Sequence, residues 1–333
     1  MNRYTVQMMS GFLACSLLFG GCTSNSAASS STNASQSESM ASSAVQASSS
    51  TAQSQTITLV DDLDRTVSFE KPNRIAVLIG SFADELANAG GKDLIVAAVH
   101  DTFTQFDLDL QDAADLGDVK NITQETLIAA KPDLVIASAK NDSQKKMLET
   151  LDQAGIPVLY YDVSTFEDYL WVLEAMSEIT GDQEAYQKNG LDQQAAIEAI
   201  RNTTRDQKPK VLALRETGKG IKALGSENSL LGQMLNDLQA ENIAGEGGLD
   251  TLSLEEIQLQ NPDAIFYVAQ GKDMETAKQM ADQLFTSDAW KNLDAVKNGR
   301  VYVLDQKLYN LKPNAKWASA LQDLEEMLYP SQD

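Results

Sequence analysis

Two glutamates occupy the same place in two matching stretches of the chain. Glu125 lies seven residues before Pro132, and Glu255 lies seven residues before Pro262. In both stretches a short polar helix leads to a Pro-Asp turn and an apolar strand, a repeated pattern that predicts two similar lobes. One exposed carboxylate on each lobe indicates a docking surface that a partner touches at two points. For either glutamate alone, an ordinary solvated helix residue is the alternative.

Groups that could carry out catalysis are scarce. The chain has one histidine, His100, and it contains none of the glycine-rich segments that hold phosphates or a nucleophilic serine. A nucleophile activated by histidine would have to use His100. We therefore expect a protein that is not an enzyme. A purely structural surface protein is a second alternative, for which tandem repeats or β-sandwich spacing would be typical.

The N-terminal residues predict export. Arg3 precedes an apolar run from about Met8 to Phe19, which is too short to span a bilayer, so residues 1–21 are interpreted as a signal peptide. The segment Leu18-Phe19-Gly20-Gly21-Cys22 is similar to a lipobox, which would make Cys22 the lipidated first residue of the mature chain. Secretion with a spare cysteine is the alternative. Residues 22–55 are almost entirely Ser, Ala, Thr, Gln and Asn and predict a disordered tether. The expected location is therefore the extracytoplasmic face of the cell membrane.

The composition excludes several kinds of partner and site. The formal net charge of the 333-residue chain is -22. Such an acidic surface disfavours nucleic acid, so we expect no nucleic-acid partner. The only cysteines are Cys15 and Cys22, so the folded part can form no disulfide and no cysteine metal site.

Strand and helix signals alternate from residue 56 to the end of the chain. Apolar strands are predicted at 56–60, 66–69, 74–79, 94–99, 134–137, 158–161, 210–214, 264–268 and 301–304. This alternation predicts an α/β fold with parallel sheets covered by helices. Residues 164–205 carry only helix signals. The predicted organisation is an N-terminal lobe at 56–183, a connecting helix at 184–206 and a C-terminal lobe at 207–333.

The order and spacing of several blocks are similar to those of a known family. The blocks are the hairpin before Pro72-Asn73-Arg74-Ile75, the two glutamate-to-Pro-Asp stretches, Asn228–Leu235 followed by Glu241-Asn242-Ile243, Trp290–Tyr302 and the last helix. Through them, residues 56–330 resemble the lipoprotein substrate-binding components of ABC importers for iron–siderophores, haem and cobalamin. The chain departs from the family at Asp64, where a glycine is usual in the hairpin turn.

The resemblance implies a fold and a partner. The fold would be two Rossmann-like lobes joined by a single long helix, with the ligand in the cleft between them. Glu125 and Glu255 match the lobe-top glutamates that pair with arginines of the permease subunits, and Glu256 is an alternative to Glu255. The protein is expected to be a monomer with no cofactor.

Ligand-contacting groups are expected on the loops at the carboxyl ends of the strands, where open α/β sheets bind ligands. The candidates are Ser81, His100, Phe103, Lys140, Tyr161, Arg215, Ser226, Gln270, Tyr309 and Lys312. Their cationic and aromatic side chains suit a bulky, anionic, partly aromatic ligand. Arg215 is the leading candidate because it directly follows a predicted buried strand. Packing of the last helix is the alternative for Tyr309 and Lys312.

His100 has three interpretations: an axial ligand to haem iron, a hydrogen-bond donor in the pocket, or a loop residue with no role in binding. Proteins that bind free zinc or manganese assemble several histidines with carboxylates. With one histidine, the chain is expected to bind no metal directly, so any metal arrives inside a chelator. The predicted function is capture of an iron(III)–siderophore for an ABC permease. A haem or corrinoid receptor of the same class is the alternative, followed by a non-transport surface protein.

Overall fold

The structure is a computed structural model that describes residues 56–249, 253–311 and 314–330. The chain divides into two units, Met1–Ala52 and Gln53–Asp333, and every described residue belongs to the second. The predicted signal peptide, Cys22, the tether and Lys312 lie outside the described residues.

A hairpin opens the described part of the chain. Strands β1 (Thr56–Val60) and β2 (Thr66–Glu70) pair antiparallel around a turn held by the Asp61 carboxylate. This carboxylate is only 2% exposed and accepts hydrogen bonds from the backbone and the guanidinium of Arg65. Asp64 adopts a φ of 57°, in the left-handed region. Glycine reaches this region without strain and aspartate tolerates it, which explains the usual glycine of the family at this position.

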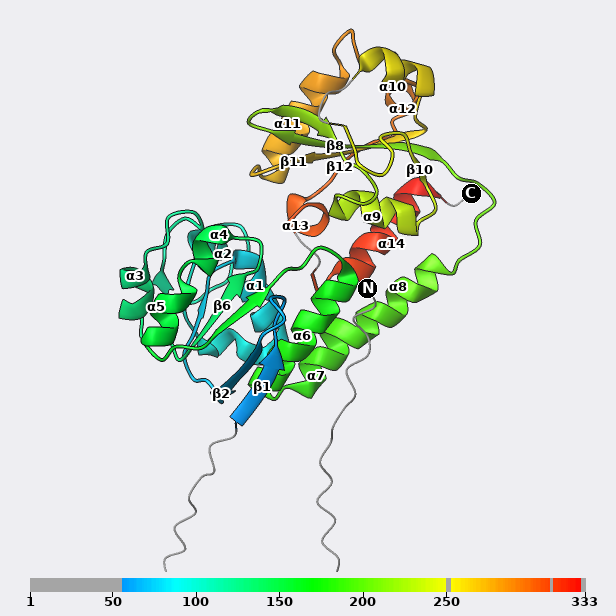
Figure 1. Ribbon diagram of the computed structural model, residues 1–333. Helices are drawn as coiled ribbons and strands as arrows, with labels where there is room; N and C mark the ends of the chain where they lie inside the picture. Colours follow the sequence, from blue (N-terminus) through cyan, green and yellow to red (C-terminus); the bar gives the residue numbers. More distant parts are fainter. Residues whose placement is uncertain (1–55, 250–252, 312–313, 331–333) are drawn as a thin grey trace, which may run out of the picture. The chain divides into compact units, whose positions relative to one another are not determined.

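The N-terminal lobe is built on a parallel sheet of five strands in the order β5-β4-β3-β6-β7, of which Figure 1 labels β6. In β6, Leu134 and Ile136 join one hydrophobic cluster while Val135 and Ala137 join another, so both faces of the sheet are buried. The strands are β3 (Ile75–Val77), β4 (Ile95–Ala98), β5 (Ala114–Asp115), β6 (Leu134–Ser138) and β7 (Val158–Tyr161). The helices between them are α1 (Gly80–Leu86), α2 (His100–Thr104), α3 (Gln124–Ala129), α4 (Asp142–Lys145) and α5 (Leu148–Gln153).

The C-terminal lobe repeats this plan with the parallel order β10-β8-β11-β12, and β9 is added antiparallel to β8. Alternate residues of β11 again enter two different hydrophobic clusters. The strands are β8 (Lys210–Thr217), β9 (Gly220–Ala223), β10 (Glu241–Asn242), β11 (Ala264–Ala269) and β12 (Val301–Val303). The helices are α9 (Leu230–Asp237), α10 (Leu254–Gln260), α11 (Met274–Phe285), α12 (Asp294–Lys297), α13 (Gln306–Tyr309) and α14 (Trp317–Leu328). A parallel sheet and a mainly parallel sheet, each covered on both faces, confirm the α/β class with two similar lobes.

Helices connect the two sheets. Helix α6 (Phe166–Thr180) ends at Gly181, whose φ of 82° terminates it. A second helical run follows, made of α7 (Gln183–Tyr186), a π-helical turn (Gln187–Leu191) and α8 (Asp192–Arg201). Gly190 lets this turn approach α6, because a Cβ atom there would lie 2.9 Å from Leu170 Cδ1. None of the helices in the described ranges is both long enough and apolar enough to cross a bilayer.

Candidate functional site

The two glutamate stretches have the same local structure. Thr123 caps α3 by accepting a hydrogen bond from Thr126 N, and Ser253 caps α10 by accepting one from Glu256 N. Lys131 and Asn261, the residues before the two prolines, both adopt left-handed backbone, with φ of 51° and 44°. The sequence repeat therefore corresponds to a structural repeat with matching caps and matching turns.

Each glutamate stretch forms a module of a helix, a Pro-Asp turn and a strand, at residues 124–138 and 254–269. The aspartate of each turn hydrogen-bonds to the start of the neighbouring strand. Asp133 accepts hydrogen bonds from Asn73 N and Arg74 N, both at 2.9 Å, in front of β3. Asp263 accepts one from Lys210 N at 2.8 Å, at the start of β8. The backbone N–H groups of Asp133 and Asp263 donate in turn to the carbonyl oxygens of Arg74 and Lys210. Each helix is thereby fixed against its own sheet.

Glu125 and Glu255 occupy the same position in the first turn of α3 and α10, the second residue after the cap. Both side chains are exposed, and Glu256 is exposed as well. Glu256, however, accepts a hydrogen bond from Gln260 Nε2 at 2.9 Å. Its equivalent in the other module is Thr126, which carries no charge. The match between modules therefore pairs Glu125 with Glu255 and not with Glu256.

These helices place both glutamates at a defined edge of each lobe. A helix that leads into a strand of a parallel sheet begins near the carboxyl ends of the strands and runs back to their amino ends. Helix α3 leads into β6, and α10 leads into β11. Glu125 and Glu255 thus lie at the edge of their own lobe where ligand-binding loops of α/β sheets are found.

In the N-terminal lobe, the segments that directly follow strands carry the predicted ligand residues Ser81, Phe103 and Lys140. Ser81 lies in the first turn of α1 after β3 and is half-buried, and Phe103 is half-buried on α2 after β4. Lys140 follows β6 and is exposed, with its Nζ 3.4 Å from Asp162 Oδ2. The positive charge of Lys140 is therefore partly offset by its own lobe.

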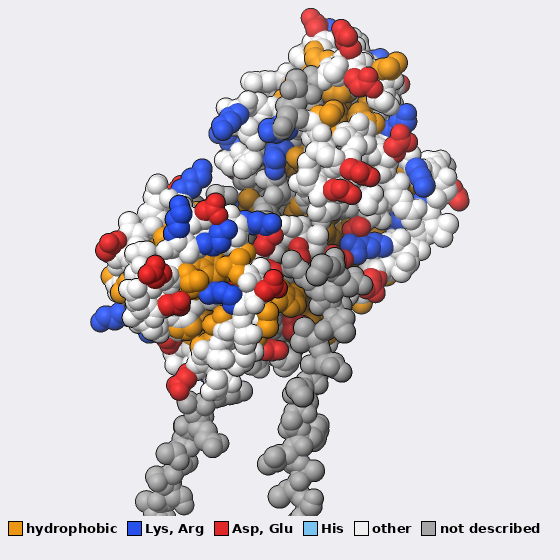
Figure 2. All heavy atoms as spheres, viewed as in Figure 1, with side chains coloured by type: hydrophobic (Ala, Val, Ile, Leu, Met, Phe, Trp, Pro, Cys, Tyr) orange, Lys and Arg blue, Asp and Glu red, His pale blue; other side chains and the backbone are white. Residues whose placement is uncertain are grey.

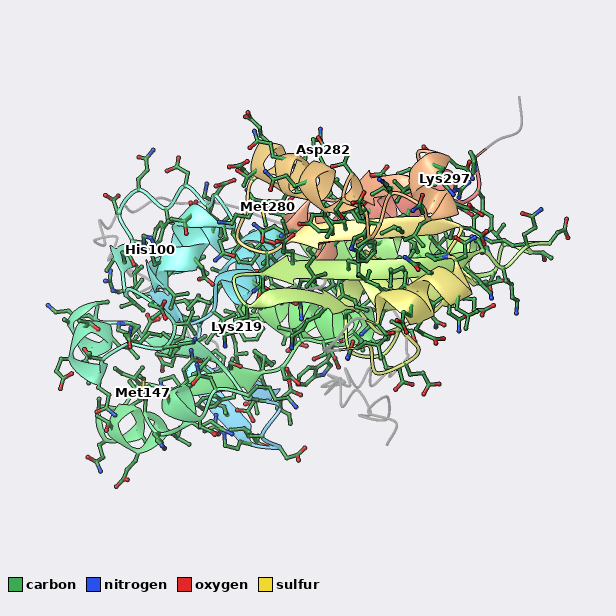
Figure 3. The ribbon with its side chains drawn as sticks, turned by 90° about the horizontal axis from the view of Figure 1, so that it is seen from above. His100, Met147, Lys219, Met280, Asp282 and Lys297 are labelled. Carbon is green, nitrogen blue, oxygen red and sulfur yellow. The ribbon has the colours of Figure 1, made fainter. Side chains whose placement is uncertain are left out.

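His100 is the first residue of α2 and is exposed (Figure 3). Its Nδ1 lies 2.7 Å from Asp115 Oδ2 at the end of β5. The hydrogen bond with Asp115, followed by the charge of that carboxylate, raises the pKa of His100. The same hydrogen bond lowers the pKa of Asp115. Asp115 thus holds the ring in place and favours its charged form.

This pair predicts a titration that NMR can follow without ambiguity, because the chain has a single histidine. We expect the imidazole pKa to fall in Asp115→Asn, since the substitution removes the carboxylate that stabilises the cation. A folded-state pKa raised above the unfolded value stabilises the protein below the unfolded pKa, and this contribution disappears as pH rises through the folded pKa. Equal imidazole pKa values in the wild type and the variant would contradict the assignment.

On the C-terminal lobe, Arg215 lies inside β8 rather than after it, because the strand continues to Thr217. The extension is a hairpin with β9 in which Arg215 faces Lys222, and Lys219 lies at its turn (Figure 3). Arg215 is half-buried, and its Nη1 donates to Asn310 Oδ1 at 3.3 Å. Its Nε is buried and has no hydrogen-bond partner. The Nε atoms of Arg201, Arg205 and Arg300 are buried without a partner as well, so this atom alone does not distinguish Arg215.

Two predicted ligand residues are packed into the core instead. Tyr161, the last residue of β7, is fully buried against Phe82 and Trp171 in edge-to-face contacts. Tyr309 is also buried, and its hydroxyl donates to the carbonyl of Ala320 in α14 at 3.2 Å. Burial raises the pKa of both phenols. For Tyr309 the structure matches the alternative of packing on the last helix.

The remaining candidates are polar groups on C-terminal loops. Ser226 follows β9 and is half-buried, and its backbone N–H donates to Gly245 O at 3.1 Å. Gln270 follows β11 and has an exposed side chain. Gln270 and Arg215 lie at the carboxyl-end side of the second sheet. Strand β9 is antiparallel to β8 and carries the chain back from that edge before Ser226.

One ion pair was not visible in the sequence. Lys307 of α13 pairs with Asp107, which follows α2 in the N-terminal lobe. The two residues are 200 positions apart, and neither belongs to a motif. The pair links the loop after α2 to α13. Helix α13 also carries Tyr309, and Asn310 follows it.

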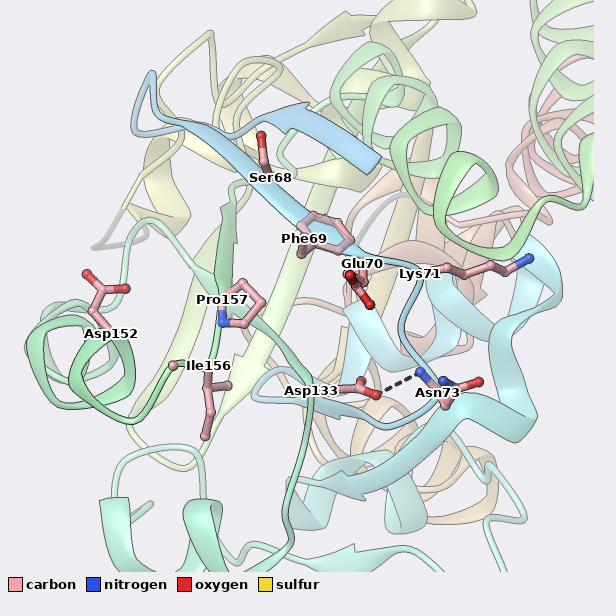
Figure 4. Close-up of a pocket in the computed structure, with 10 residues that line it drawn as sticks. Ser68, Phe69, Glu70, Lys71, Asn73, Asp133, Asp152, Ile156 and Pro157 are labelled. Carbon is pink, nitrogen blue, oxygen red and sulfur yellow. Dashed lines mark hydrogen bonds between the residues drawn. The ribbon is translucent and has the colours of Figure 1, made fainter. Parts of the chain in front are cut away.

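The hollow shown in Figure 4 lies apart from the predicted ligand residues. It is lined by residues such as Phe69, Asp133 and Pro157, beside the hairpin and in front of β6 and β7. These are the amino ends of the strands, and none of the predicted ligand residues lines the hollow. Among the residues that the structure describes, no three His, Cys, Asp or Glu side chains are grouped so that they could hold a metal ion.

Comparison with known proteins identifies the family. The family model named periplasmic binding protein matches residues 75–308, more than half of the chain. The chain belongs to this family. It is accordingly a substrate-binding protein of the ABC-importer type, as the sequence analysis predicted.

Individual relatives are distant but extend over most of this periplasmic binding protein. It is 25% identical over 283 residues to an uncharacterized ABC transporter substrate-binding lipoprotein of Bacillus subtilis, covering 82% of this chain and 86% of that protein. It is 27% identical over 266 residues to a vitamin B12-binding protein of Vibrio campbellii, covering 73% and 92%. It is 24% identical over 270 residues to a petrobactin-binding protein of Bacillus subtilis, covering 78% and 83%.

A solved structure agrees on the fold. A periplasmic solute-binding protein from Veillonella parvula matches with a TM-score of 0.66 at 24% identity, covering 82% of this chain and 86% of that chain. At this identity the match concerns the fold alone, and it supports the two-lobed α/β architecture predicted from the sequence.

Proposed function

We propose that this protein is a lipid-anchored, extracytoplasmic receptor that captures an iron(III)–siderophore between its two lobes and delivers it to the permease of an ABC importer. The chelate is cargo and not a cofactor. The protein works as a monomer and performs no catalysis, in keeping with a family of solute-binding proteins.

The single observation that carries the ligand class is Arg215. It is half-buried near the end of β8, and Asn310 contacts its Nη1 from another loop. A positioned guanidinium at the carboxyl-end side of a sheet suits a carboxylate or a catecholate, which accept two parallel N–H bonds. The petrobactin-binding relative supports the siderophore class. The vitamin B12-binding relative supports the corrinoid alternative, and haem remains the other alternative in the same importer class.

Tryptophan fluorescence of the purified protein tests the ligand class. The chain contains three tryptophans, so a bound coloured chelate should quench the emission. We expect saturable quenching by at least one member of a panel of catecholate, hydroxamate and carboxylate ferric siderophores. Saturation by haemin or cobalamin alone would replace the siderophore with the corresponding alternative. No saturable ligand in the whole panel would favour a non-transport surface protein.

The docking proposal derives from the repeated modules. Glu125 and Glu255 hold equivalent exposed positions on equivalent helices, and both helices are fixed to their sheets through Asp133 and Asp263. Two separated carboxylates that meet two basic side chains of a permease would define a single docking orientation. The structural match between the modules supports Glu255 rather than Glu256 in this proposed role.

The membrane anchor depends on Cys22, which lies outside the described residues. We expect Cys22→Ser to release the protein into the medium, because a lipid chain is then no longer attached. Cell fractionation followed by immunoblotting measures this shift. A Cys15→Ser variant is a matched control and should stay at the membrane. Unchanged membrane retention of Cys22→Ser would contradict the lipid anchor.

A further inference from the structure

Leu259 is an unusual surface residue. Its side chain is 79% exposed, whereas the other large exposed hydrophobic residues in the described part of the chain, Val60 and Leu249, are 46% and 41% exposed. It lies in α10, four residues after Glu255, so the two side chains share one face of the helix. Figure 2 shows acidic and hydrophobic side chains next to each other at the top of the view, over α10.

The repeated module shows that the fold does not require this leucine. The buried residues Leu127 of α3 and Ile257 of α10 are equivalent, since each lies five residues before its proline. The position equivalent to Leu259 is Ala129, which is also exposed. Alanine and leucine are similarly good helix formers, so propensity does not account for the difference. The module folds with a small side chain at this point in one lobe and carries a large apolar one in the other.

The neighbours of Leu259 on α10 are engaged within the protein. Gln258 Nε2 donates to Ala289 O at 3.2 Å, and Gln260 Nε2 donates to Glu256 at 2.9 Å. Among the described residues, no side-chain hydrogen bond of this kind is found for Glu255. The helix thus satisfies its other polar side chains internally and leaves a carboxylate and a leucine, one turn apart, facing solvent.

We propose that Glu255 and Leu259 form one docking face, whose occupant is a permease subunit with a basic side chain one helical turn from an apolar recess. The inference depends on the proposed function, and it adds that the two docking points are not equivalent. The C-terminal lobe has an apolar anchor beside its charge, and the N-terminal lobe has only Ala129 beside Glu125. An anchor that becomes buried contributes affinity, while the flanking charge pair guides orientation.

The test is the dissociation constant of the ligand-free, full-length exported receptor for the permease–ATPase complex of the same importer in lipid nanodiscs. We expect Leu259→Ala to raise this constant about tenfold, because loss of a buried apolar anchor removes most of its transfer free energy. Val60→Ala, which shortens another exposed apolar side chain, should leave it unchanged. The thermal unfolding midpoint of Leu259→Ala should equal that of the wild type.

The outcomes distinguish this inference from the docking proposal on which it depends. If Leu259→Ala binds like the wild type while Glu255→Ala binds more weakly, the apolar anchor is overturned and the glutamate docking stands. If wild type, Glu255→Ala and the Glu125→Ala/Glu255→Ala double variant all bind equally, the docking proposal itself fails. A wild-type dimer in sedimentation that disappears in Leu259→Ala would assign the face to a second copy of this chain and overturn the permease as occupant.

Discussion

Replacing Arg215 with alanine should weaken binding of the best ligand by roughly 10- to 150-fold. This range corresponds to about 1.5–3 kcal/mol, the usual contribution of a hydrogen bond to a charged group. The structure gives the reason: Asn310 holds the half-buried guanidinium of Arg215 on the carboxyl-end side of the sheet, where a ligand anion would pair with it. Fluorescence titration with the ligand found in the panel measures the change.

Two controls separate ligand contact from general damage. Arg215→Lys keeps the charge but loses the planar fork, so its affinity should fall between those of the wild type and Arg215→Ala. Lys278→Ala removes one positive charge from the exposed face of α11 and should bind like the wild type. An unchanged dissociation constant in Arg215→Ala would mean that Arg215 serves only the packing of β8 and the contact with Asn310.

Removing both docking glutamates should nearly abolish uptake while leaving ligand affinity unchanged. Single exposed ion pairs contribute only about 0.2–1 kcal/mol, and more when an interface desolvates them. Glu125→Ala or Glu255→Ala alone should therefore reduce uptake partially, and the double variant severely. Charge reversal to lysine should be worse than alanine because it adds repulsion to a lost attraction. Uptake of labelled ferric chelate, beside fluorescence titration of each purified receptor, measures both effects.

Glu256→Ala is the matched control for this experiment. Glu256 neighbours Glu255 in the chain and is exposed, but it accepts a hydrogen bond from Gln260, and its counterpart in the N-terminal module is the uncharged Thr126. Its uptake should equal that of the wild type. Normal uptake in the double variant would contradict the docking role, and so would a parallel loss of ligand binding.

Local patterns in the sequence were sufficient to predict most of the strands and helices of the fold. Continuous apolar runs such as 134–137 and 264–268 predicted β6 and β11, because strands covered on both faces need no polar alternation. The two-residue strands β5 and β10 were missed because so short a segment carries no periodicity. Strand β9 was missed because Gly220–Ala223 becomes a strand only by pairing with the end of β8.

The candidate site was less predictable because it depends on side-chain direction. The end of β7 was identified correctly, yet Tyr161 points into the core against Phe82 and Trp171. Arg215 was expected on a loop and lies in a strand, since the β8–β9 hairpin extends the sheet beyond the apolar run. The pairing of Lys307 with Asp107 depends on tertiary structure alone. In contrast, the sequence repeat alone singled out Glu125 and Glu255, because matching caps and turns in the two modules require similar residues.

Iron uptake by cells that lack this chain bears most directly on its assignment as the receptor of an importer. Cells with the gene deleted and cells complemented with the wild-type gene would be supplied with radioactive iron in the ferric siderophore that saturates the purified protein. We expect uptake to be lost on deletion, restored by the wild-type gene, and not restored by the Glu125→Ala/Glu255→Ala variant. Equal uptake with and without the chain, for a ligand that it binds, would contradict the role of receptor.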